Sequence, residues 1–463
     1  MGRCRVYQRD ELNAGVEYAT LSHCWGRTRY LTLSKNNLQQ LETQIPSEDL
    51  SRTVQDAITI AHDLGFEYIW VDTLCIIQDD LADWKREAAS MTSVYENSSL
   101  NIAAAGARDG RDGCFFSRPT HWNCKLQLYN SQHTLEYSAA PVSLYSQCLI
   151  DMPLMERGWV LQERLLAVRT LHFTTTELFW ECNHTTACES FPERLPGDMR
   201  MSSRFLHKKT INDSMWPWII ARYSACKLTY VKDKLVAISG LARKIHQQTN
   251  DQYVAGLWRK HLEAQLCWFI WIPGPRRETE AYIAPSWSWA SVDVPVHTNH
   301  VSLLDRPVLI SVVDVKIGYT EFDSFGTINS ATMRVRCCGL HRASFDGSTN
   351  ELLLPGNKGV TGGTVMPDNS PDGGDETIQE GLLLPVFVDN GNDEAIIGLV
   401  LKLSGQGKGV YRRVGRFCVS LKESLIDTLG QIVDDGYGHL SRTYAEVLRD
   451  DSGVTLGYMI DII

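Results

Sequence analysis

Short apolar runs alternate with an amphipathic helix pattern in the first part of this chain, and this alternation strongly constrains its fold. Residues 18–22 are typical of a buried strand, and Ser51 can cap a helix whose apolar residues recur every three or four positions until Gly65. Residues 68–72 follow at once as a second apolar run that ends in a carboxylate. Strand, helix and strand in this order predict a parallel α/β sheet.

A second helix and a third strand continue the alternation. The helix begins near Asp80, with Glu87 beside a stripe that we expect to be buried, namely Trp84, Ala88, Met91 and Tyr95. Residues 100–105 predict the third strand. Ligands of α/β sheets bind at the loops that follow the carboxyl ends of the strands. The sequence therefore predicts a binding site built from the loops 22–26, 72–80 and 106–113.

The pattern changes twice beyond this α/β region, which we place at residues 1–205. Residues 206–295 show helical periodicity and predict an α-helical extension. Alternating apolar and polar residues in 296–463 predict a small β-rich C-terminal region. Within it, residues 357–375 are rich in Gly, Pro, Asp and Asn and lack apolar periodicity, which predicts a flexible insertion.

Composition argues against several classes of partner. The chain has 45 basic and 55 acidic residues and a net charge of −10, with no basic run that could follow a phosphate backbone, so we expect no nucleic-acid partner. Apolar stretches such as 266–273 are shorter than the roughly 20 residues of a membrane span, so we expect no membrane anchor. No secretory signal is apparent, and the 13 cysteines are scattered as in a reducing compartment, which predicts a cytoplasmic location.

One cysteine group could be considered for metal binding. Cys182, His184 and Cys188 lie close together and could supply three zinc ligands. A fourth ligand and a paired Cys-x-x-Cys motif are missing nearby. We therefore predict no metal site and interpret these cysteines as packing residues.

Three segments of the chain together resemble the signature of the fungal heterokaryon-incompatibility (HET) domain. They are YATLSHCWG at 18–26, YIWVDTLCIIQDD at 68–80 and RGWVLQE at 157–163. Two later segments, DKLVAISGL at 233–241 and APSWSWAS at 284–291, resemble blocks that often follow HET domains in larger proteins. The resemblance covers roughly residues 15–295, and the segments occur in the same order as in the family.

The resemblance implies a fold and a cellular role. HET domains are considered similar to Toll/interleukin-receptor (TIR) domains, so we expect a TIR-like, flavodoxin-like parallel sheet core. Many HET proteins act in fungal non-self recognition and programmed cell death, and some TIR relatives cleave NAD at the nicotinamide glycosidic bond. The resemblance therefore suggests NAD or a similar nucleotide as the substrate, with no required cofactor, and self-association as a mode of signalling.

Glu87 is the first candidate for catalysis if NAD is the substrate. Cleavage of the nicotinamide bond mainly needs a carboxylate near the ribose hydroxyls and the oxocarbenium-like charge. Glu87 lies on the helix that follows the strand ending in Asp72, which would place it near the carboxyl edge of the sheet. Alternatively, Glu87 is solvated or pairs with Arg86. Asp72 is a second catalytic candidate, which could instead cap the backbone amides of its own loop.

Cys75 is a candidate nucleophile. Its thiolate could be stabilised by His23 as a base, with Asp72 orienting that base. The alternative is a buried cysteine that only packs. The residues that we expect to contact a ligand are Ser22, His23, Trp25, Gln78, Asp79, Arg157, Gln162 and Glu163.

Two of these ligand candidates have clear structural alternatives. Arg157 could hold a phosphate, or it could join an internal Arg–Glu network with Glu163 that links the third segment to the sheet. Trp25 could stack on a ligand or fill the core. We interpret Trp287 and Trp289 as packing residues only.

Three functions remain open from the sequence. The first is a cell-death effector that cleaves or binds NAD-type nucleotides, and the second is a non-catalytic module that signals by self-association. The third is a small-molecule tailoring enzyme, such as a cyclase, of fungal secondary metabolism. A cyclase should show an enclosed apolar pocket, whereas an NAD site should be an open cleft that contains Glu87 and polar donors.

Overall fold

The computed structural model describes residues 4–118, 124–129, 134–201, 208, 211–274, 282–298, 306–320, 323–353, 363–369, 378–390, 394–421, 428–429 and 443–463. It divides into two compact units. The first comprises Met1–Ile211, Cys226–Leu228 and Val236–Lys244, and the second comprises Asn212–Ala225, Thr229–Leu235 and Ile245–Ile463. The predicted division into three parts differs from this packing, because residues 206–295 are shared between the two units.

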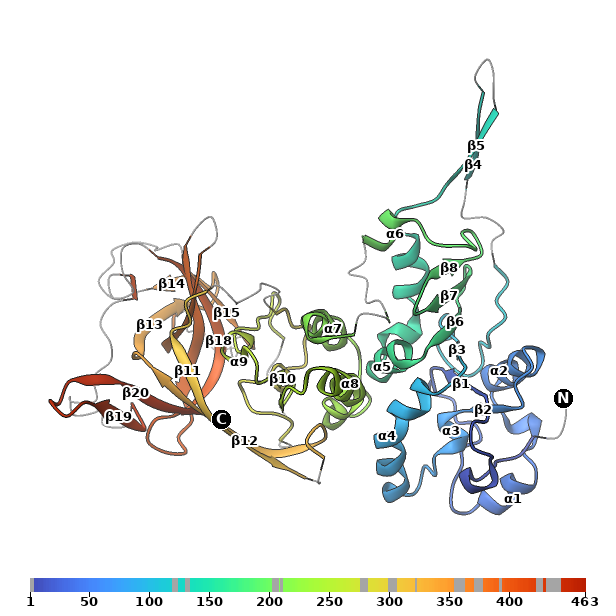
Figure 1. Ribbon diagram of the computed structural model, residues 1–463, viewed down its shortest axis with the longest axis horizontal. Coiled ribbons are helices and arrows are strands. Elements are labelled where there is room, and N and C mark those ends of the chain that lie inside the picture. The colour runs from blue at the N-terminus through green and yellow to red at the C-terminus, as the bar shows by residue number, and fades with distance from the viewer. Residues whose placement is uncertain are drawn as a thin grey trace. The chain divides into compact units, whose positions relative to one another are not determined.

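The first unit contains a mixed α/β structure (Figure 1). In its described residues, a six-stranded sheet has the order β2-β1-β3-β6-β7-β8. These strands are β1 (Tyr18–Ser22), β2 (Tyr68–Trp70), β3 (Leu100–Ala103), β6 (Arg169–Phe173), β7 (Leu178–Cys182) and β8 (Thr186–Cys188). The pairs among β2, β1, β3 and β6 are parallel, which confirms the predicted parallel sheet, and β7 and β8 add antiparallel strands. A separate hairpin consists of β4 (Cys124–Tyr129) and β5 (Thr134–Ala139).

Two helices of the first unit begin at residues whose side chains cap them. The helices of this unit include α1 (Leu38–Thr43), α2 (Arg52–Asp63), α3 (Asp72–Cys75), α4 (Leu81–Glu96), α5 (Gly158–Leu166) and α6 (Gly197–Met201). The Ser51 side chain accepts a hydrogen bond from the backbone of α2, and the Asp80 side chain does the same for α4. Both predicted helix starts are therefore confirmed.

The buried face of α2 follows the predicted spacing with one exception. Val54, Ala57 and Ala61 are buried in a core that also contains Leu21 of β1. Leu64 was expected on the same face but is 52% exposed, because the helix ends at Asp63 and the chain turns there. The buried face of α2 packs against one side of the parallel sheet and fixes the position of β1.

Gly26 allows the loop after β1 to meet a second loop closely. Its φ is +71°, a left-handed conformation that favours glycine. A Cβ at this position would lie 2.0 Å from the Asp109 Cβ and 2.9 Å from the Asp109 Cα. The loops 22–26 and 106–113, which we predicted to form one site, therefore lie against each other.

The second unit combines helices with a large, mostly antiparallel sheet. Its helices include α7 (Trp216–Ser224) and α9 (Leu262–Gln265), while α8 (Ser239–Thr249) crosses the division between the units. In the described residues, ten strands form one sheet: β11 (Ile310–Tyr319), β12 (Ile328–Cys337), β13 (His341–Asp346), β14 (Leu352–Leu353), β15 (Thr364–Pro367), β16 (Ile378–Asp389), β17 (Ala395–Leu403), β18 (Val410–Ser420), β19 (Glu446–Arg449) and β20 (Thr455–Ile462). Within this sheet, β18 and β20 are parallel to each other. A further pair consists of β9 (Tyr253–Val254) and β10 (Leu257–Trp258). The predicted β-rich C-terminal region is confirmed.

The predicted flexible insertion at 357–375 is partly an ordered strand. Residues 364–367 form β15, which pairs with β18, and Asp368 is buried beside Arg413. The prediction is wrong for these residues, because a buried ion pair and strand pairing replace the missing apolar periodicity. Residues 357–362 and 370–375 lie outside the described residues.

Within the described part of the chain, no helix has the length and apolar character that crossing a membrane requires.

Replacing Gly26 with alanine should destabilise the first unit more than the same change at Gly15. Gly15 has a φ of +83° with no atom near the added Cβ, so Gly15→Ala should cost about 1 kcal/mol from the left-handed conformation alone. Gly26→Ala adds the collision with Asp109, and we expect at least twice that loss. Urea unfolding of both variants measures the two losses, and equal values would contradict the close approach of the two loops.

Candidate functional site

The carboxyl ends of β1 and β2 bring the first two signature segments together. Trp25 Nε1 donates a hydrogen bond of 2.8 Å to Asp72 Oδ2. Asp72 Oδ1 accepts a hydrogen bond of 2.7 Å from the Thr73 backbone and lies 3.6 Å from His23 Nδ1. Asp72 therefore caps its own loop, as considered from the sequence, and it also holds the indole of Trp25, a contact that the sequence did not predict.

Trp25 lies at the boundary between core and solvent. It is 36% exposed, whereas the neighbouring His23 is buried. The indole is therefore not a core residue, and its N–H is fixed by the carboxylate of Asp72. A ring held in this way offers a surface on which a planar ligand can stack.

A short hydrogen bond joins the end of β1 to the third signature segment. Ser22 Oγ lies 2.5 Å from Glu163 Oε2 and 3.2 Å from Asn101 Oδ1. The hydroxyl has one proton, so it can donate to only one of these oxygens at a time, and the distances favour Glu163. Both Ser22 and Glu163 are buried.

Burial makes Glu163 titrate near neutral pH. Desolvation raises the pKa of Glu163 to about 7, and the negative charge of Asp72 raises it further. Hydrogen bonds from Ser22 and Tyr95 and the positive charge of Arg157 oppose this change. The carboxyl group is therefore partly protonated at neutral pH.

Arg157 ties the third segment to the same strand end. Its Nη1 donates a hydrogen bond of 2.7 Å to the backbone carbonyl of His23. Gln162, one turn into α5, accepts a hydrogen bond of 3.2 Å from the Gly240 backbone through Oε1. These contacts, together with the Ser22–Glu163 bond, correspond to the internal network that we considered as the alternative to phosphate binding.

Glu87 lies half-buried on α4. Its Oε2 accepts a hydrogen bond of 3.3 Å from Ser90 Oγ, and its Oε1 lies 3.6 Å from Arg86 Nε. The side chain is 24% exposed. The predicted pairing with Arg86 is present, but it is long and leaves part of the carboxylate accessible.

Cys75 sits in an environment that disfavours a thiolate. Its Sγ accepts a hydrogen bond of 3.4 Å from the Val71 backbone. Burial raises the pKa of Cys75 to about 12, and the charges of Asp72 and Glu87 raise it further. The thiol is therefore protonated at neutral pH, and burial likewise lowers the pKa of His23. The arrangement does not favour Cys75 as a nucleophile. It does place Asp72 and Glu87 close enough to Cys75 for both charges to affect its pKa.

Gln78 and Asp79 are used within the loop that carries them. Gln78 Nε2 donates to the backbone carbonyls of Asp72 and Ile76 at 2.9 and 3.0 Å. Asp79 Oδ1 accepts a hydrogen bond of 2.8 Å from the Lys35 backbone. Both side chains therefore fix the loop, and we describe no ligand-facing role for them.

Comparison with known protein families identifies the part of the chain that holds this site. Residues 18–163 match the model of the family described as heterokaryon incompatibility protein (HET). This segment is a HET domain. The match begins at the first residue of the first signature segment and ends at the last residue of the third. No curated protein and no solved structure is significantly similar to the chain.

The HET domain also uses aromatic residues that the sequence analysis treated only as packing. Tyr95 is buried, and its hydroxyl donates a hydrogen bond of 3.3 Å to the Leu21 carbonyl. Trp84 and Trp159 contact each other edge to face, with ring centroids 6.4 Å apart. Tyr95 is the last member of the buried stripe on α4. A hydroxyl group at a position expected to be buried indicates a hydrogen bond in the core, and this feature of the sequence could have predicted the role of Tyr95. Asn101, a polar residue inside a short apolar strand, carried the same kind of signal.

A second buried network lies next to the HET domain in the first unit. Glu181 accepts hydrogen bonds from Arg164 Nε at 2.7 Å and Tyr145 Oη at 2.8 Å, and it lies 2.8 Å from His172 Nε2. These four side chains are buried. Charge pairing with Arg164 holds the pKa of Glu181 well below its usual range despite burial. We interpret this network as structural, because it connects α5 to β6 and β7 without exposure to solvent.

Metal binding finds no support in the described residues. Among them, no group of three or more His, Cys, Asp or Glu side chains is arranged to hold a metal ion.

Glu163 should give the first unit a distinctive dependence of stability on pH. The unfolded carboxyl ionises near its ordinary pKa of 4.5, whereas the folded one holds its proton up to about pH 7. The folded state therefore binds more protons between these values, and its stability should fall as the pH rises from 4.5 to 7, by on the order of 3 kcal/mol. Glu163→Gln removes this group, so the variant should gain stability relative to wild type across that window.

Urea unfolding at pH 5.0 and 7.5 measures this difference. Glu156→Gln is the matched control, because Glu156 has a 54% exposed side chain and pairs with Lys227 on the surface. We expect the control to follow the wild type at both pH values. Parallel behaviour of Glu163→Gln and wild type would show that Glu163 is ionised in the folded protein throughout.

Proposed function

We propose that the HET domain serves heterokaryon incompatibility and cell death by cleaving an NAD-type dinucleotide at the carboxyl ends of β1 and β2. The observation that carries this proposal is that two partly exposed carboxylates, Asp72 and Glu87, both lie close enough to Cys75 to raise its pKa, and that Asp72 also holds the partly exposed indole of Trp25. A carboxylate and an aromatic surface are the two elements that cleavage of a nicotinamide glycosidic bond needs.

The strand order supports the position of this site. The parallel strands follow the order β2-β1-β3-β6, and the order reverses between β1 and β3. Flavodoxin-like sheets have the order 2-1-3-4-5 and bind ligands at that reversal. A TIR-like, flavodoxin-like relationship for the HET domain belongs to this proposal. Ser22 ends β1 at the reversal, next to the residues described above.

The two carboxylates have different roles in the proposed reaction. Both oxygens of Asp72 already accept hydrogen bonds, from Trp25 and Thr73, so Asp72 positions the indole. Among the described residues, Glu87 contacts Ser90 through a weak hydrogen bond and Arg86 at long range, so its carboxylate can accept ribose hydroxyls. We therefore assign the catalytic role to Glu87.

The proposed reaction is a hydrolysis. The bond between ribose C1′ and the nicotinamide nitrogen breaks, and nicotinamide leaves as a neutral molecule with the electron pair. Water then bonds to C1′ and releases a proton, which gives ADP-ribose. The negative charge of Glu87 stabilises the positive charge that develops on the ribose.

The polar character of this strand edge distinguishes the proposal from the tailoring enzyme. A cyclase would need an enclosed apolar pocket with few polar groups. Here the carboxyl ends of β1 and β2 carry Ser22, His23 and Asp72. Signalling by self-association alone would not need the accessible carboxylate of Glu87.

Glu87→Gln should reduce nicotinamide release by about 100-fold, because it removes the charge that stabilises the ribose while keeping the side-chain volume. Glu96→Gln is the matched control on the same helix, where Glu96 pairs with Lys244 at 2.8 Å. The control should keep its rate within about twofold. Release of nicotinamide from NAD by purified protein measures both variants, and equal rates in Glu87→Gln and wild type would remove Glu87 from the proposed mechanism.

Trp25→Ala should leave the protein folded but weaken NAD binding. A fully buried tryptophan costs about 3 to 5 kcal/mol when truncated, whereas the 36% exposed Trp25 should cost less than this. Trp25→Phe keeps an aromatic face but loses the hydrogen bond to Asp72, so it should bind NAD with intermediate affinity. Thermal unfolding and calorimetric titration with NAD test both variants. An unfolded Trp25→Ala protein would place this indole in the core instead.

A further inference from the structure

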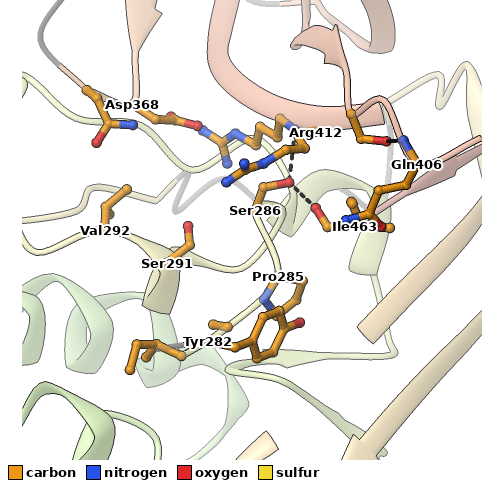
Figure 2. Close-up of a pocket in the computed structure, with 14 residues that line it drawn as sticks. Tyr282, Pro285, Ser286, Ser291, Val292, Asp368, Gln406, Arg412 and Ile463 are labelled. Carbon is orange, nitrogen blue, oxygen red and sulfur yellow. Dashed lines mark hydrogen bonds and ion pairs between the residues drawn. The ribbon is translucent and has the colours of Figure 1, made fainter. Parts of the chain in front are cut away.

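The second unit contains a pocket that the proposed function does not use. Its volume is about 330 Å³, and its lining comes from five separate stretches of the chain (Figure 2). Small-molecule sites typically have volumes of about 300 to 1,000 Å³, so the pocket is large enough for a small ligand. It lies within the second unit alone.

One wall of the pocket is the segment APSWSWAS at 284–291, which the sequence analysis interpreted as packing. Trp287 and Trp289 are completely buried, and Trp289 Nε1 donates a hydrogen bond of 2.7 Å to the Gly256 carbonyl. Ser286 and Ser291 from the same segment line the pocket. The tryptophans therefore anchor the segment, while the residues on either side of them form a fixed wall for a ligand.

On the polar side of the pocket, the positive charge of Arg412 is not paired with a described residue. Asp368 and Arg413 pair with each other at 3.0 Å, and both are buried. The Ile463 carbonyl oxygen accepts hydrogen bonds from the backbone and the hydroxyl of Ser286. Arg412 is exposed and forms no ion pair with a described residue. Its guanidinium is therefore free to bind a carboxylate or a phosphate.

Arg413, which also lines the pocket, has a buried donor group that lacks a partner among the described residues. Its guanidinium lies 3.3 Å from the ring centroid of Trp268, and its Nη atoms donate to the carbonyls of Leu266 and Trp268 at 2.9 and 2.6 Å. Its Nε is buried and has no hydrogen-bond partner in the described structure. A buried donor without a partner is unusual, and Arg413 lines the pocket together with Arg412.

The opposite side of the pocket is apolar and aromatic. Tyr282 and Pro285 lie across the pocket from Asp368 and Arg412 in Figure 2. The Tyr282 side chain is 42% exposed, so its ring is available for contact. Val292 adds a buried apolar residue to the pocket lining. The pocket thus has an apolar surface that can contact a ring on one side and the guanidinium of Arg412 on the other.

We propose that this pocket binds a small organic anion that carries a planar ring, with the ring against Tyr282 and Pro285 and the carboxylate or phosphate on Arg412. The two-sided lining selects for a ligand that has both parts, since either part alone leaves one side of the pocket filled with water. This site belongs to the second unit and does not depend on the proposed activity of the HET domain.

Phenyl phosphate is a suitable probe because it has a ring and a phosphate. Calorimetric titration of the full chain should show binding, and Arg412→Gln should weaken it at least tenfold. Arg449→Gln is the matched control, because Arg449 is an exposed arginine of β19 in the same unit that does not line the pocket. The control should change the affinity less than twofold.

Further titrations separate the two parts of the ligand and the two units. Inorganic phosphate and benzyl alcohol should each bind at least tenfold more weakly than phenyl phosphate, and Tyr282→Leu should weaken phenyl phosphate more than inorganic phosphate. Glu87→Gln should leave binding of phenyl phosphate unchanged. No binding to wild type, equal binding to Arg412→Gln, or loss of binding in Glu87→Gln would each overturn the proposal.

Discussion

The hydrogen bond between Ser22 and Glu163 holds the candidate site together. It joins the carboxyl end of β1 to α5 at 2.5 Å, and Arg157 adds a second tie through the His23 carbonyl at 2.7 Å. The Trp25–Asp72 hydrogen bond then joins the same strand end to the loop after β2. Three segments that are distant in the chain therefore meet at one strand end.

Burial of this network sets its chemistry as well as its geometry. Glu163 is buried and has a pKa of about 7, whereas Asp72 is partly exposed and held by two donors. Protonation of Glu163 removes a negative charge that would otherwise repel that of Asp72. Burial raises the pKa of Cys75 to about 12, with a further contribution from the charges of Asp72 and Glu87, and keeps its thiol neutral. A thiolate nucleophile is therefore disfavoured at this position mainly because the thiol is buried.

Local features of the sequence were sufficient to predict the α/β elements but not the packing between them. The Ser51 cap and the apolar spacing of α2 act over a few residues, so they could be predicted. The Ser22–Glu163 bond joins residues 141 positions apart, and no local pattern encodes such a pair. Helical periodicity likewise cannot tell on which unit a helix packs, so residues 206–295 were assigned to one extension. β15 was missed because this four-residue strand buries Val365 in the core but is too short to show an apolar period, and it is held by pairing with β18 and by the Asp368–Arg413 ion pair beside it.

The charges at the strand edge also limit how a dinucleotide could bind there. Asp72 and Glu87 attract the cationic nicotinamide ring but repel the pyrophosphate, and Arg157 already donates to the His23 carbonyl. The nicotinamide riboside end should therefore lie at this edge, with the pyrophosphate directed away from the carboxylates. As the glycosidic bond breaks, positive charge moves from the ring to the ribose. A carboxylate accelerates the reaction only if it lies nearer the ribose than the ring, because equal attraction to both would stabilise the bound substrate as much as the transition state. Asp72, fixed by Trp25, suits the ring side, and Glu87, with an accessible oxygen, suits the ribose side.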